Sequence, residues 1–477
     1  MSYSDWEAVI GLEIHAQLQT NSKMFSPDSA AFGGADNEHV HPVSLGMPGV
    51  LPTLNRRAVE FAIRTGLALN CRIREKSVFA RKNYFYPDLP KGYQISQFDE
   101  PICEEGLVEY FLDGETRKVR IERAHLEEDA GKSQHSGDYT LINLNRAGVP
   151  LLEIVSGPDM RSPSEAAEYA RTVRKILRYL EVCDGNLEEG SMRCDCNVSV
   201  RKKGADKLGT KVELKNINSF RFVEKAIEYE IQRQIETIES GEKIVQETRL
   251  YDSTKNRTYS MRSKEEAHDY RYFPDPDLLP VRLEKSLIEK IRGELPELPL
   301  ARAGRFQADF GLPAYDSFVL TAEKALADYF EQVADQSKNP KAASNWIMVE
   351  LLRELNEARV EVESSPISAS SLAGLIRMID SKEISGKMAK EVFAEMWKTS
   401  KEPAEIVKSK GMTQISDSGA LEKIVDTVMT ANASAVAEYR GGKQKLFGFF
   451  VGQVMKASKG QANPEMVNQI LQTKLKG

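Results

Sequence analysis

Residues 9–18 carry the sequence VIGLEIHAQL, in which apolar and polar side chains alternate. A period of two is typical of a β-strand, because successive side chains of a strand point to opposite faces of the sheet. Leu12 and Ile14 are therefore expected to face a core, and Glu13 and His15 to face away from it. A carboxylate and an imidazole two residues apart on one face are close enough to share one ligand.

The same alternation returns in two later segments. Residues 194–201 place Asp195 on their polar face, and residues 210–215 place Lys211, Glu213 and Lys215 on theirs. Three strands with acidic groups on a polar face favour a sheet whose open side holds a cation or a charged substrate. The alternative is an ordinary solvated face, which antiparallel sheets commonly have.

The order of the segments indicates the fold class. Over residues 1–292, short alternating runs and a few helices mix without a regular βαβ alternation, which favours an α+β domain with a mostly antiparallel sheet. Pro296 and Pro299 mark a linker, and the sequence beyond them is typical of helices. We therefore expect an all-helical middle domain over residues 293–405 and an all-helical tail domain over residues 406–477.

Composition limits the classes of function. The chain has 477 residues and a formal net charge of −6, so any contact with RNA must come from a local basic patch. Its five cysteines lack the spacing of a disulfide framework, and Asp5 and Glu7 stand where a secretory signal would be basic. No apolar stretch approaches the roughly 18 residues of a membrane span. We expect a cytoplasmic protein without membrane contact.

Aromatic and basic residues interleave over residues 81–93. Aromatic rings stack on unpaired bases while lysine and arginine meet phosphates, so Tyr84 and Tyr86 are candidates for contact with a single-stranded nucleic-acid end. The alternative is that these rings anchor a proline-rich loop to the core.

A second candidate for RNA contact lies near the C-terminus, where basic residues cluster beside phenylalanines with no acid between residues 440 and 459. Such a local patch has the charge that contact with a phosphate backbone needs. The alternative is an ordinary solvated helix face. The basic residues of this tail patch are Arg440, Lys443, Lys445, Lys456 and Lys459.

Residues 127–129 are three consecutive acids, which repel one another unless a cation compensates them. Mg²⁺ or Mn²⁺ prefers carboxylate oxygens and tolerates an occasional imidazole. Zinc is less suited, because Cys194 and Cys196 have the alternation of core residues. An acidic surface turn is the alternative. The candidate metal ligands are Glu13, His15, Glu128, Asp195 and Glu213.

No phosphate-binding loop, dinucleotide-binding glycine motif or nucleophile motif occurs in the sequence. An enzyme that uses a nucleotide without such a loop must hold it through a metal and basic side chains. Arg146, Arg193 and Lys211 could neutralise a phosphoryl group. Of these, Arg193 and Lys211 are candidate catalytic residues together with Glu128. Single basic residues are also common as plain surface charges.

Six motifs in chain order resemble a known family, that of the B subunit of the tRNA-dependent amidotransferase. The resemblance extends from residue 9 to the C-terminus. The motifs are GLEIH at 11–15, RKNYFYPD at 81–88, HLEEDAGK at 125–132, NRAGVPLLEIV at 145–155, DYRYFP at 269–274 and GQVMKASKGQANP at 452–464.

The resemblance implies a heterotrimer with an amidase-type A subunit and a small C subunit, acting on misacylated Glu-tRNA(Gln) or Asp-tRNA(Asn). ATP would phosphorylate the side-chain carboxylate in an N-terminal cradle domain, and ammonia from the amidase partner would displace phosphate. The helical domains would hold the tRNA body. Carried over by position, the metal ligands would be His15, Glu128, Asp195 and Glu213 with Glu13 beside them, and Lys82 would contact ammonia or the phosphoryl group.

Two other classes of function fit the residues without the resemblance. One is a metal-dependent phosphoryl hydrolase or nuclease that uses the acidic cluster to activate a water molecule. The other is a non-catalytic tRNA-binding scaffold with a basic helical tail.

Overall fold

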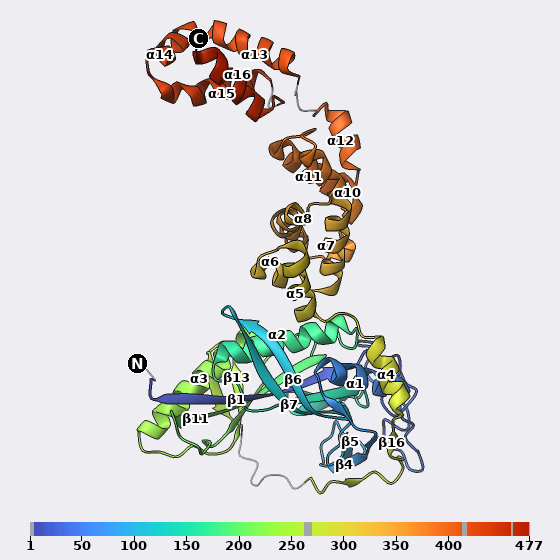
Figure 1. Cartoon of the computed structure of the whole chain (residues 1–477). Coiled ribbons are helices and arrows are strands. Elements are labelled where there is room, and N and C mark those ends of the chain that lie inside the picture. The colour runs from blue at the N-terminus through green and yellow to red at the C-terminus, as the bar shows by residue number, and fades with distance from the viewer. Residues whose placement is uncertain (1–3, 262–269, 413–416, 459–460, 477) are drawn as a thin grey trace. The chain divides into compact units, whose positions relative to one another are not determined.

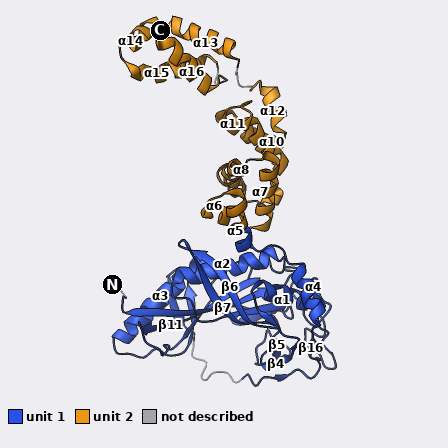
Figure 2. Cartoon of the chain, viewed as in Figure 1, with its two compact units in different colours: residues 1–302 blue, residues 303–477 orange. Residues whose placement is uncertain are grey.

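The computed structural model describes residues 4–261, 270–412, 417–458 and 461–476. The chain forms two compact units, residues 1–302 and 303–477 (Figure 2). The first unit combines a large, mostly antiparallel sheet with helices, and the second is helical. The α+β class predicted from the sequence is therefore confirmed.

The first unit is built on a nine-stranded sheet in which only β12 and β13 pair in parallel. The predicted strand at residues 9–18 lies within β1, which pairs with β10 on one side and β11 on the other. In spatial order the strands are β14 (Arg257–Ser260), β13 (Thr248–Asp252), β12 (Val212–Lys215), β11 (Met192–Lys202), β1 (Trp6–Gln17), β10 (Pro150–Ser156), β7 (Glu115–Glu128), β6 (Cys103–Leu112) and β2 (Arg72–Ile73).

Helices cover the apolar face of this sheet. The helices are α1 (Arg56–Ala68), α2 (Pro163–Tyr179) and α3 (Phe220–Glu239), and α4 (Lys285–Gly293) packs against α1. Figure 1 shows α2 and α3 lying across the sheet. Ser162 and Glu165 form a capping box that fixes the start of α2. Leu12 and Ile14 are fully buried in the core beneath these helices, whereas the opposite face of β1 carries polar side chains.

A small three-stranded sheet packs against the polar side of the large sheet, where β5 contacts β7. Its strands, in spatial order, are β15 (Phe273–Pro274), β4 (Phe79–Asn83) and β5 (Tyr93–Gln97). Figure 1 shows β4 and β5 on the side of the large sheet away from α2. Two further pairs complete the unit: β3 (Lys76–Ser77) with β16 (Val281–Arg282), and β8 (Lys132–Ser136) with β9 (Tyr139–Asn143).

The helical unit buries two separate apolar clusters, one over residues 306–407 and one over residues 421–475. Helix α12 runs across the predicted boundary at residue 405, and its Ile406 and Val407 belong to the first cluster. The exact division into a middle and a tail domain stays a prediction. No helix in the described part of the chain has the length and apolar character needed to cross a membrane.

The helices of this region are α5 (Pro299–Phe310), α6 (Ala314–Leu320), α7 (Lys324–Ser337), α8 (Pro340–Trp346), a π-helical turn (Ile347–Leu351), α9 (Leu352–Ala358), a 3₁₀ turn (Val362–Ser364), α10 (Ala369–Asp380), α11 (Gly386–Thr399), α12 (Pro403–Lys410), α13 (Ser418–Ala431), α14 (Ala433–Arg440), a 3₁₀ turn (Gln444–Leu446), α15 (Phe447–Ala457) and α16 (Pro464–Lys476).

Candidate functional site

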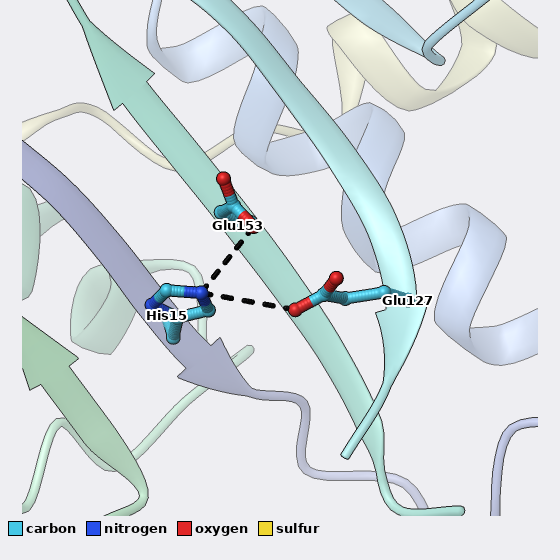
Figure 3. Close-up of side chains that lie close together, drawn as sticks. All are labelled: His15, Glu127 and Glu153. Carbon is cyan, nitrogen blue, oxygen red and sulfur yellow. Dashed lines mark ion pairs between the residues drawn. The ribbon is translucent and has the colours of Figure 1, made fainter. Parts of the chain in front are cut away.

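Three neighbouring strands bring a histidine and two glutamates together on the polar face of the large sheet (Figure 3). His15 on β1 pairs in register with Glu153 on β10, and Glu127 comes from β7. The Nε2 atom of His15 lies 3.3 Å from Oε2 of Glu153 and 3.8 Å from Oε1 of Glu127. One ligand atom from each residue lies within 4.8 Å of the others, so this three-residue cluster can hold a metal ion.

The three-residue cluster has strongly shifted acid–base properties. Burial alone would lower the pKa of His15, but the contacts with Glu153 and Glu127 outweigh it and raise the pKa to about 9. Burial and the charge of Glu153 raise the pKa of Glu127 to about 7. Burial opposes ionisation of Glu153, but the neighbouring imidazoles hold its pKa well below the usual range. A protonated His15 therefore balances the carboxylates of this cluster.

Further groups surround the three-residue cluster. His125 Nε2 lies 3.6 Å from Glu153, and burial lowers the pKa of His125 to about 4. Ser96 Oγ on β5 donates to Glu127 over 3.3 Å. Burial lowers the pKa of Lys82, but the charges of Glu127 and Glu153 outweigh it and raise the pKa overall. Lys82, which was predicted to contact ammonia or the phosphoryl group, thus lies within the electrostatic reach of this cluster.

The other predicted ligands on β1, β11 and β12 form a separate group on the same face. Lys215 Nζ lies 3.1 Å from Asp195 and 3.2 Å from Glu213, so its ammonium bridges the two carboxylates. Glu13 accepts a hydrogen bond of 2.9 Å from Asn197. The structure therefore places Glu13, Asp195 and Glu213 near the cluster around His15 but outside it.

The placement of Glu128 differs from the one expected. Its neighbour Glu127 shares the polar face with His15, and strand alternation turns Glu128 the opposite way. Glu128 forms a buried ion pair with Lys91 and accepts the backbone N–H of Ile95 at 2.9 Å. Glu127 therefore occupies the position in the cluster that was predicted for Glu128.

Glu127 and Glu153 were not predicted as candidate ligands, although the sequence holds a signal for each. His125 and Glu127 repeat the two-residue spacing of Glu13 and His15. Glu153 is the single charged residue in PLLEIVS, a strand that is otherwise apolar except for its last residue and is buried throughout. A lone acid within a buried strand requires a partner, because an unpaired buried charge is costly.

The predicted basic residues have different surroundings. Arg193 donates to both carboxylate oxygens of Asp129, over 2.9 and 3.1 Å. Asp129 is buried and also accepts a hydrogen bond of 2.8 Å from Gln17. Lys211 precedes β12 at an exposed position and is not brought to this site. Lys215, which the sequence analysis did not select, is the lysine of this segment that contacts the acidic groups.

The residues predicted to bind RNA remain at or near the surface. The rings of Tyr84 and Tyr86 lie 6.1 Å apart beside the small sheet. Arg440 donates to backbone carbonyls at the end of α16, and Lys443 pairs with Glu438. The other members of the tail patch are Lys445 and Lys456, which are exposed, and Lys459, which lies outside the described residues. Cys194 and Cys196 are buried, which confirms that they are core residues.

Comparison with known proteins gives consistent matches over the whole chain. Residues 8–289 match the family described as the GatB/GatE catalytic domain, and residues 328–475 match the GatB domain. The chain is 66% identical to the B subunit of the aspartyl/glutamyl-tRNA(Asn/Gln) amidotransferase of Bdellovibrio bacteriovorus, with all of both chains covered. It is 57% identical to the corresponding protein of Solidesulfovibrio magneticus, with 98% of this chain and 99% of that one covered.

Proposed function

The chain belongs to the family of aspartyl/glutamyl-tRNA(Asn/Gln) amidotransferase B subunits, and we propose that its first unit holds the site at which a tRNA-bound carboxylate is phosphorylated and amidated. Members of this family are subunits of an ATP-using ligase complex. We infer that the substrates are misacylated Glu-tRNA(Gln) or Asp-tRNA(Asn), and that the partners are an amidase-type A subunit and a small C subunit. The observation that carries the proposal is the cluster of His15, Glu127 and Glu153 beside Lys82.

The donor set of this cluster fits Mg²⁺ or Mn²⁺. The two carboxylates are hard oxygen ligands, the single imidazole is a borderline donor that these ions tolerate, and further positions are left for water or phosphate oxygens. Bound there, the ion would supply charge neutralisation at the phosphates of ATP. His15 would ligate through Nε2, the atom that now faces Glu153 and Glu127.

The proposed reaction has two steps. A side-chain carboxylate oxygen attacks the terminal phosphorus of ATP, the bond to the bridging oxygen breaks, and ADP leaves. Ammonia then attacks the acyl carbon and phosphate leaves, which gives the amide. Lys82 is charged and lies close enough to Glu127 and Glu153 to stabilise negative charge on the transferred phosphoryl group. Arg193, held by Asp129, offers a second cation on the same face.

The test uses the assembled enzyme with misacylated tRNA, ATP, Mg²⁺ and ammonium chloride in place of glutamine. Amide formation on the tRNA, with one ADP formed per amide, supports the proposal. Hydrolysis of RNA or of phosphoesters without ATP would instead favour the metal-dependent hydrolase. Binding of tRNA without any turnover would favour the scaffold.

Metal binding to the three-residue cluster is expected to depend on pH. Because the pKa of His15 is about 9, the ion must displace a proton from its imidazole at any lower pH. The affinity for Mn²⁺ should therefore rise by up to about ten-fold per pH unit from pH 7 toward pH 9 and then level off. Electron paramagnetic resonance of free Mn²⁺ measures this directly. An affinity that stays constant from pH 7 to pH 8.5 would argue against His15 as a ligand.

We also propose that the tail patch contacts the tRNA backbone through its exposed lysines Lys445 and Lys456. Replacing both by alanine should weaken tRNA binding at low salt and reduce the slope of log affinity against log salt by about one per lost phosphate contact. The control is Lys338→Ala, which removes an exposed lysine outside the tail patch. Filter-binding titrations at several salt concentrations measure the slope. An unchanged slope in the double variant would exclude contact through these two lysines.

A further inference from the structure

The small sheet turns one of its faces toward the three-residue cluster. Lys82 on β4 pairs with Gln94 on β5, so these side chains share a face with Ser96, two residues further along β5. Ser96 donates to Glu127, which places this face on the side of the cluster. Phe98 comes directly after β5 and stacks on Tyr272, whose pKa is raised by burial and is also affected by Lys82, Glu127 and Glu153. The face is therefore directed at the proposed reaction centre and not at the helices.

Five aromatic side chains form a continuous row along this face. They come from two segments nearly two hundred residues apart, which β15 and β4 bring side by side. We call this set the aromatic row; in order it consists of Tyr86, Tyr84, Tyr270, Tyr272 and Phe98. The centroids of successive rings in this order are separated by 6.1, 6.1, 6.1 and 4.2 Å.

The ends of the aromatic row are open to solvent. Tyr86 is 45% exposed at one end and Phe98 is 50% exposed at the other. The planes of Phe98 and Tyr272 differ by only 5°, so the two rings are stacked in parallel. Rings that anchor a loop to a core would be buried, and a parallel pair with half of one ring exposed offers a surface on which a further planar group can stack.

Positive charge accompanies the rings. Lys82 Nζ lies 4.8 Å from the centroid of Tyr270, so a cation lies beside the aromatic row and within the electrostatic reach of Glu127 and Glu153. Aromatic rings that alternate with cations suit single-stranded nucleic acid, whose bases stack while its phosphates meet the positive charges. The row and the cluster together thus match a strand of nucleotides whose last member carries the reacting group.

We propose that the aromatic row binds the unpaired 3′ nucleotides of the tRNA substrate by base stacking, with Phe98 and Tyr272 as one platform. This inference rests on the proposed function, because the reacting amino acid is esterified to the 3′ end. Five rings in series are longer than one adenine can cover, so a run of nucleotides fits the row better than the base of ATP. Lys82 then lies where the chain of nucleotides meets the reaction centre.

The experiment compares two RNA hairpins on the assembled enzyme. One hairpin reproduces the tRNA acceptor stem with its unpaired 3′ nucleotides, and the other lacks them. The variants Phe98→Leu and Tyr272→Leu remove a ring but keep an apolar side chain, whereas Phe98→Tyr and Tyr272→Phe keep the ring. Base–aromatic stacking predicts that each leucine variant binds the complete hairpin about ten-fold more weakly.

The two changes are expected to be non-additive, because they remove the same contact. The wild type should lose affinity when the unpaired nucleotides are removed, and the leucine variants should lose much less. The ring-keeping variants should behave as the wild type. Equal losses in the wild type and the leucine variants would overturn the inference.

Two further outcomes are distinguishable. If the leucine variants raise the KM for ATP and leave hairpin affinity unchanged, the row serves the adenine of ATP and the inference is wrong. If the wild-type enzyme binds the hairpin but forms no amide from misacylated tRNA and ammonium chloride, the proposed function fails by itself. If amide is formed but the affinity for the hairpin does not depend on the unpaired nucleotides, only the proposed role of the aromatic row is rejected.

Discussion

Glu153→Gln should reduce ammonia-dependent amidation of misacylated tRNA by about a thousand-fold, because a metal ion held in the proposed site would supply several kcal/mol of charge stabilisation to phosphoryl transfer. Glutamine keeps the size of the side chain but removes the charge that faces His15 and His125. The affinity for tRNA should stay unchanged, since Glu153 lies on the sheet and not in the aromatic row. The readouts are amide formation at saturating tRNA and the binding of Mn²⁺.

Two matched variants sharpen this prediction. Glu109→Gln on β6 of the same sheet removes a half-exposed ion pair with Lys118 and should leave both readouts unchanged. Glu128→Gln should retain Mn²⁺ binding, because Glu128 contacts Lys91 and the Ile95 N–H instead of the cluster. If Glu128→Gln loses Mn²⁺ binding and Glu153→Gln retains it, Glu128 and not Glu153 is the metal ligand.

Asp129→Asn should lower the free energy of unfolding of the first unit by about 3 kcal/mol, the cost of leaving one member of a buried ion pair without its partner. Arg193 makes two contacts to Asp129, and Arg146 lies 3.7 Å from the same carboxylate. An asparagine would remove the carboxylate from both guanidinium groups, of which Arg146 keeps its hydrogen bonds to the carbonyls of Ala130 and Gly131. Asp159→Asn is the control, because its arginine partner Arg120 is largely exposed, and it should cost at most about 1 kcal/mol.

Urea unfolding can follow the first unit alone. Trp6 is its single tryptophan, so Trp346→Phe and Trp397→Phe leave one fluorescent reporter there. Burial raises the pKa of Asp129, but Arg193 and Arg146 outweigh it and lower the pKa overall. The stabilisation is thus complete above the ordinary aspartate pKa of about 4 and is lost as the pH falls through the lowered value. Equal stability of Asp129→Asn and wild type at pH 7 would contradict this assignment.

Local alternation was enough to predict the orientation of the polar residues on β1, β11 and β12. Glu13, His15, Asp195 and Glu213 do share one face of the sheet. The run of acids at residues 127–129 was assigned to the wrong face, although the buried Leu126 directly precedes it in the same strand. Alternation from Leu126 turns Glu127 to the polar face and Glu128 away from it, and the pairing of β7 with β10 brings Glu127 to His15.

The contacts that the site residues make also could not be predicted from the local sequence pattern. Lys211 and Lys215 both follow the polar alternation around Glu213, but β12 begins at Val212 and only Lys215 lies within the paired strand. The row that joins Tyr84 to Tyr270 depends on the pairing of β4 with β15. Resemblance to the family supplied the chemistry, whereas the position of each residue in the site required the fold.

The central place of β1 in the sheet has a consequence for synthesis. β1 ends at Gln17, but its neighbours β10 and β11 begin only at Pro150 and Met192. At about 5–20 residues per second, the ribosome leaves both edges of β1 unpaired for on the order of ten seconds. A strand with one apolar face and two open edges invites pairing with other chains. Slower translation or chaperone depletion should therefore reduce the yield of this protein by aggregation of nascent chains before residue 202 emerges.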